Sequence, residues 1–258
     1  MKQNILTILF FISTFGLKAQ EYKFRENISK DSLFNVSIKM LPEEMREEYI
    51  KTYKEGDEKS KDFLLLMISM PRSSKKELIE NYENKKEEIL KLKNEYQKIV
   101  PKNHVIDIEF EPENKIFTIP EQISIKVCKV DNQEKNTDKN KRQSNNGLKA
   151  VSQHWNLKPE SKELQKVLKS IGWTNEELNQ IKQLLLNANC ISIENGKITT
   201  IGFARSGMGK YFYIFFEEPL NEIQKQEYNN GCQYIYYKEN VVLEYGGGAI
   251  GPQCFEKD

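Results

Sequence analysis

The sequence is poor in the residue types that build metal and catalytic centres. It contains two histidines, His104 and His154, and each stands alone, away from the cysteines. A zinc site usually needs pairs of ligands separated by only about two to four residues, and the chain has no such pair. No metal site is therefore predicted, and no motif indicates a cofactor.

Long apolar runs are also missing. The most apolar segment, Ile5–Leu17, is shorter than the roughly 20 residues that a membrane-spanning helix requires, and no later run comes closer. This segment follows the basic Lys2 and precedes the small Ala19, which is the order of a secretory signal peptide. We expect residues 1–19 to be cleaved on export, leaving a periplasmic or extracellular protein without a membrane span.

An excess of one charge is absent too. The chain has 39 Lys and Arg residues against 38 Asp and Glu residues, and removing Lys2 and Lys18 with the signal leaves 37 against 38. A nucleic-acid-binding protein usually carries a strongly basic domain or stripe, and a membrane-surface protein often carries a polybasic segment. We therefore expect no nucleic-acid partner and a solvated surface of mixed charge.

The four cysteines are Cys128, Cys190, Cys232 and Cys254. Export to an oxidising compartment favours disulfides, and four cysteines allow three complete pairings. We predict one bridge, Cys232–Cys254, which would tie the glycine-rich C-terminal tail to the start of a strand. The alternative for the other cysteines is that they are buried as small apolar residues.

Residues 20–130 are predicted to form an N-terminal α+β domain that begins with an extended strand around Leu33–Ile38. Ser74 and Glu77 form a capping box at the start of the longest helix, which we expect to pack on the preceding helix as a hairpin. A coiled-coil oligomerisation segment is the alternative for this helix. The three predicted helices span residues 42–56, 57–70 and 74–101. Apolar residues on one face of the longest helix are Leu78, Tyr82, Ile89, Leu92, Tyr96 and Ile99.

A small antiparallel sheet is predicted after these helices, from strands at residues 105–111, 116–119 and 123–130. In the first strand, Asp107, Glu109 and Glu111 alternate with apolar residues. We expect these carboxylates to face solvent, because no glycine-turned loop with calcium-ligand spacing surrounds them. Residues 131–150 are highly polar, with Leu148 as the only large apolar residue, and are predicted to be a flexible linker between domains.

Residues 151–258 are predicted to form a second α+β domain with the order α-α-β-β-β-α-β-β and a mainly antiparallel sheet. Asn195-Gly196 lies between apolar runs and is a strong hairpin signal. The aromatic run Lys210–Phe216 is typical of a strand buried on both faces, so we place it in the middle of the sheet.

The loop before this strand, Arg205–Gly209, contains serine and glycine. It nevertheless fits neither the serine nucleophile elbow nor the phosphate-binding loop. A serine nucleophile elbow needs a glycine where Ala204 stands, and a phosphate loop must open a helix, whereas Lys210 opens a predicted strand. A hairpin loop is the simpler interpretation.

Tyrosines are concentrated on the last strands, and tyrosine suits recognition surfaces because its apolar ring carries a polar tip. If alternate tyrosines face outward, the sheet presents an aromatic surface next to the loop; otherwise they belong to the core. The predicted binding residues are Arg205, Ser206, Met208, Lys210, Tyr211, Tyr213, Tyr234 and Tyr236.

These features favour an exported, non-enzymatic binding protein of the cell envelope or extracellular space. Its partner would be a protein, a peptide or a glycan, and no catalytic residue is predicted. The alternative is a secreted hydrolase whose site is assembled from scattered residues, with Ser206, His154 and the carboxylates as the available groups.

Overall fold

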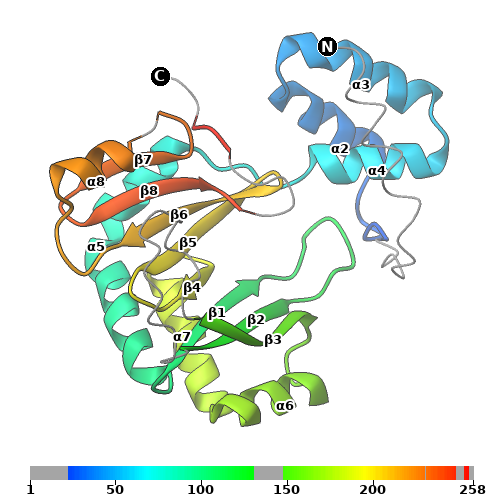
Figure 1. Ribbon diagram of the computed structural model, residues 1–258. Helices are drawn as coiled ribbons and strands as arrows, with labels where there is room; N and C mark the ends of the chain where they lie inside the picture. The colour runs from blue at the N-terminus through cyan, green and yellow to red at the C-terminus, as the bar shows by residue number, and fades with distance from the viewer. Residues whose placement is uncertain (1–22, 131–147, 230, 248–252, 256–258) are drawn as a thin grey trace.

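An eight-stranded sheet, with helices packed mainly on one face, organises the computed structural model (Figure 1). The structure describes residues 23–130, 148–229, 231–247 and 253–255. The predicted signal peptide and most of the predicted linker lie outside these residues. The predicted α+β class is confirmed, with a mainly antiparallel sheet.

The described residues form eight helical elements and eight strands. The helical elements are α2 (Lys30–Ser37), the 3-10 helix η2 (Ile38–Met40), α3 (Glu43–Glu55), α4 (Glu58–Ile68), α5 (Lys75–Ile99), α6 (Lys162–Ile171), α7 (Asn175–Asn187) and α8 (Glu222–Glu227). The strands are β1 (His104–Glu111), β2 (Gln122–Val130), β3 (Leu148–Leu157), β4 (Ser192–Glu194), β5 (Thr199–Ser206), β6 (Gly209–Phe215), β7 (Tyr234–Lys238) and β8 (Val241–Gly246).

The strands lie in the order β3-β2-β1-β4-β5-β6-β8-β7, and every neighbouring pair is antiparallel. Two meanders, β1-β2-β3 and β4-β5-β6, meet where β1 pairs with β4. At this junction Asp107 lies opposite Glu194 and Glu109 lies opposite Ser192. Strands from both sides of the predicted domain boundary therefore belong to one sheet.

Strand β3 is absent from the sequence-based prediction, which assigns its first three residues to the linker. It lies at the edge of the sheet, pairs only with β2 among the described strands, and has two register shifts in that pairing. Most of its residues are exposed. An edge strand with bulges need not alternate between apolar and polar residues, so the pattern is hard to see in the sequence.

The main core lies between the sheet and helices α5, α6 and α7. The apolar face of α5 packs here and not on α4, so the predicted pairing of these two helices is wrong. The Tyr96 hydroxyl on α5 donates to the Ile106 carbonyl on β1 at 2.9 Å, which joins helix to sheet. Within the helical layer, the Trp173 indole between α6 and α7 donates to the Ile99 carbonyl at the end of α5 at 3.1 Å. The apolar stripe of α5 thus matches the apolar side chains of the sheet.

A second, smaller core holds helices α2, α3 and α4 together, apart from the sheet (Figure 1). The predicted strand at Leu33–Ile38 is wrong, because Ser29 caps helix α2 by accepting a hydrogen bond from the backbone N–H of Ser32. The predicted strand at residues 116–119 is also wrong. Its only pairing among the described residues is the isolated bridge of Phe117 with Phe24.

The predicted central strand is confirmed as β6, between β5 and β8. Its Tyr211, Tyr213 and Phe215 enter the main core, whereas Ile214 lies in a third core on the opposite face. Leu220 and Tyr228, which flank α8, cover that part of the opposite face. The three helices of the main core, α5, α6 and α7, do not cover the rest of the opposite face.

The predicted Cys232–Cys254 disulfide is present, and Cys128 and Cys190 are free and buried. Among the residues that the structure describes, no helix combines the length and apolarity needed to cross a membrane. The disulfide is compatible with an exported protein.

Candidate functional site

The structure separates the predicted tyrosines into two groups. Tyr211 and Tyr213 are fully buried on the helix-covered face, where the Tyr213 hydroxyl donates to the Leu78 carbonyl at 2.7 Å. These two tyrosines belong to the core and not to an exposed aromatic surface. Tyr234 and Tyr236 are half-buried on the opposite face, packed against the third core.

The predicted loop is a tight hairpin between β5 and β6, with Gly207 and Met208 at its tip. Gly207 has a φ of +58°, a conformation that glycine adopts readily. The Ser206 hydroxyl donates to the Ser73 carbonyl at 2.9 Å and accepts from the Ser73 N–H at 3.2 Å. The hairpin is therefore anchored to the segment before α5, and Met208 remains exposed.

Arg205 and Lys210 face each other across this hairpin and both reach the carboxylate of Glu109 on β1. Lys210 Nζ donates to Glu109 Oε2 at 3.1 Å, and Arg205 Nη2 lies 2.8 Å from Glu109 Oε1. Arg205 also pairs with Glu111. Glu109 is only 8% exposed, so the expectation that it faces solvent is wrong. Two cations offset the cost of burying its charge.

Lys210 on β6 reaches across β5 and β4 to Glu109 on β1, because β5 carries a glycine at this position. A Cβ atom at Gly202 would lie 2.1 Å from the Ser192 hydroxyl and 3.2 Å from Cδ of Lys210. Lys210 Nζ also donates to that hydroxyl at 3.0 Å. The missing side chain at Gly202 thus leaves the space in which lysine and serine meet.

A pair of carboxyl groups lies beside this network, at the junction of the two meanders. Asp107 and Glu194 are directly opposite each other on β1 and β4. Burial, together with the negative charge of Asp107, raises the pKa of Glu194 to about 7, although the positive charges of Lys126 and Lys210 oppose the rise. Burial also raises the pKa of Asp107. A carboxyl group with a pKa near neutrality can donate or accept a proton at physiological pH.

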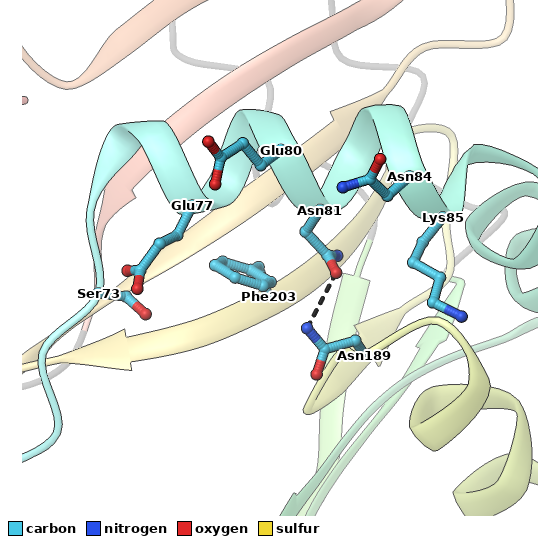
Figure 2. Close-up of a pocket in the computed structure, with 8 residues that line it drawn as sticks. All are labelled: Ser73, Glu77, Glu80, Asn81, Asn84, Lys85, Asn189 and Phe203. Atoms are coloured by element: carbon cyan, nitrogen blue, oxygen red, sulfur yellow. Dashed lines mark hydrogen bonds between the residues drawn. The ribbon is translucent and has the colours of Figure 1, made fainter.

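A groove of about 410 Å³ lies beneath the first half of α5, and the anchor residue Ser73 is one of its lining residues (Figure 2). Figure 2 shows the Phe203 ring below the helix and the Asn189 side chain bonded to Asn81. Asn81 is buried, and its amide donates to the Ala188 carbonyl and to the Tyr213 hydroxyl, both at 3.2 Å. The lining residues are Ser73, Glu77, Glu80, Asn81, Asn84, Lys85, Asn189 and Phe203.

The structure does not bring together the groups that a hydrolase of the serine type would need. Ser206 lies at the end of β5, and His154 lies on β3, four positions away in the sheet. At about 4.8 Å between neighbouring strands, the two strands are about 19 Å apart. The His154 ring instead lies 3.8 Å from Glu163. The cysteines offer no better nucleophile. Cys254 has no free thiol because it is in the disulfide, and burial raises the pKa of the Cys190 thiol, which disfavours the reactive thiolate. Within the described ranges, no group of three or more His, Cys, Asp or Glu residues could hold a metal ion.

Comparison with protein-family models, with curated proteins and with solved structures finds no match to this chain.

The sequence-based reasoning selects Arg205 and Lys210 but misses their partners Glu109, Glu111 and Ser192. Alternation along β1 is visible in the sequence, yet the face to which it points depends on the pairing with β4. The groove residues Glu77, Glu80, Asn81, Asn84 and Lys85 do carry a signal, because spacings of 3, 1, 3 and 1 place them on one side of a helix.

Proposed function

We propose that the protein is exported and acts as a non-enzymatic binding protein. Its recognition surface is the β5–β6 hairpin together with the adjoining charged face of the sheet. The partner is a protein, a peptide or a glycan. One observation carries the proposal: the main-core helices cover one face of the sheet, and the β5–β6 hairpin exposes Met208 at its tip.

The chemistry of the hairpin supports this proposal. Met208 is 37% exposed, and methionine adapts its flexible, polarisable side chain to the shape of a partner. Arg205 and Lys210 flank it and are held in place by Glu109, so little side-chain entropy is lost when a partner contacts them. The disulfide is compatible with export.

The hydrolase alternative has one observation in its favour, the Asp107–Glu194 carboxyl pair with its raised pKa values. Such shifts also occur in structural ion networks. The two grooves beside α5 are lined by other residues. We therefore favour binding.

Site-specific photo-crosslinking in intact cells tests the proposal. The photo-reactive residue p-benzoylphenylalanine replaces Met208 in one variant and Ile223 in a matched control, because Ile223 is an exposed apolar residue on α8. We expect a discrete adduct from position 208 and none of the same mass from position 223. The same adducts from both positions, or none from position 208, would refute the proposed surface.

A further inference from the structure

We propose that the groove beneath α5 binds a neutral saccharide. The site is separate from the charged sheet face and does not depend on the binding function proposed for the hairpin. Its volume of about 410 Å³ falls in the range of small-molecule sites, roughly 300–1,000 Å³. The ligand class follows from the chemistry of the lining.

Three of the lining side chains are amides, from Asn81, Asn84 and Asn189. Each amide offers both donors and acceptors. The Asn84 amide is exposed and makes no hydrogen bond within the part of the chain that the structure describes, and Asn189 uses its Nδ2 on Asn81. Most small-molecule sites are largely apolar with few polar groups. A ligand that matches this groove must instead carry several hydroxyl groups, each of which is both donor and acceptor.

The charges at the groove favour a ligand without net charge. A Glu77 carboxylate oxygen accepts from the Ser74 N–H at 2.8 Å in the helix cap, and Lys85 pairs with Glu88 at 3.4 Å. Glu80 lies 3.7 Å from Lys76. Because these charges already have partners, the groove gains little from an ionic ligand, and its two carboxylates repel a phosphate. Phe203 also lines the groove, but it is only 7% exposed and belongs to the main core, so polar side chains provide most of the surface that a ligand would contact.

The floor of the groove is held in place before any ligand arrives. Asn189 Nδ2 donates to Asn81 Oδ1 at 2.9 Å, and Asn81 in turn donates to the Tyr213 hydroxyl at 3.2 Å. The Tyr213 hydroxyl donates to the Leu78 carbonyl, which completes the chain of bonds. A preorganised floor reduces the ordering cost of binding.

The test uses the full chain and follows the side-chain amides by nuclear magnetic resonance. The probes are cellohexaose, maltohexaose, xylohexaose and chitohexaose, with spermidine as a cationic probe, each at up to about 10 mM, which detects even a millimolar Kd. We expect at least one hexasaccharide to shift the Asn84 and Asn189 amide signals saturably. Asn84→Ala should weaken that binding at least about tenfold, the effect of losing roughly 1.4 kcal/mol.

Asn187→Ala is the matched control, because Asn187 is an exposed amide that lines the neighbouring groove and not this one. It should leave the affinity unchanged. The inference is overturned if no hexasaccharide gives saturable shifts, if only spermidine does, or if Asn84→Ala and Asn187→Ala weaken binding equally. Photo-crosslinking at Met208 is unaffected by any of these results, so the two proposals fail separately.

Discussion

Replacing Glu194 by glutamine should make the protein more stable above neutral pH. Glu194 lies opposite Asp107 in the centre of the sheet, and burial together with that negative charge raises its pKa from 4.5 to about 7. The native state therefore holds a proton that the unfolded chain releases at lower pH. Between pH 4.5 and about 7 the native state binds more protons, so its stability falls as the pH rises through this window.

The size of the effect follows from the shift. A rise in pKa from 4.5 to about 7 corresponds to about 3 kcal/mol of stability lost above neutrality. Burial also raises the pKa of Asp107, which acts in the same direction. Glutamine has the shape of the protonated glutamate and cannot ionise. Glu194→Gln should therefore exceed the parent protein by less than about 1 kcal/mol at pH 5 and by up to about 3 kcal/mol at pH 8.

Urea unfolding at pH 5 and pH 8, followed by circular dichroism, measures this difference. Glu217→Gln is the control, because Glu217 is an exposed carboxylate in the segment between β6 and α8. It should leave the pH dependence of the parent protein unchanged. The reasoning fails if the parent protein gains stability between pH 5 and pH 8, or if Glu194→Gln loses stability with rising pH as steeply as the parent does.

Two further substitutions test the packing around the site and the tail. Gly202→Ala should destabilise the protein by on the order of 1–3 kcal/mol in urea unfolding, because the new Cβ would lie 2.1 Å from the Ser192 hydroxyl; a neutral effect would mean that this contact is absent. Cys232→Ser should cost about 3 kcal/mol by opening a loop of 22 residues, and a reducing agent should lower the parent protein to the same stability. An unchanged parent protein under reduction would show that the bridge does not form.

Much of the fold can be predicted from the sequence because its signals are local. The capping boxes at Ser74 and Thr174 place the starts of α5 and α7 within the chain itself, since the cap bonds join residues three apart. Asn195-Gly196 predicts the β4–β5 hairpin for the same reason. The Cys232–Cys254 bridge is one of the pairings that four cysteines allow, and the structure selects it.

The errors arise where a segment has two compatible partners or a weak pattern. The apolar stripe of α5 fits another helix as well as a sheet, and periodicity alone does not choose between them. The segment at Leu33–Ile38 is short, so the Ser29 cap outweighs its apolar content and makes a helix. Strand β3 has bulges and exposed residues, which hide the alternation that a strand normally shows.

The sequence by itself determined most of the local elements and the α+β class, because caps, turns and short-range periodicity act between near neighbours. Only the tertiary structure decided that β1 pairs with β4, and with it the burial of Glu109 between Arg205 and Lys210. Glu109 lies about a hundred positions before Arg205 and Lys210 in the sequence. Register between distant strands depends on how all the apolar faces pack together, and that is a property of the whole sheet.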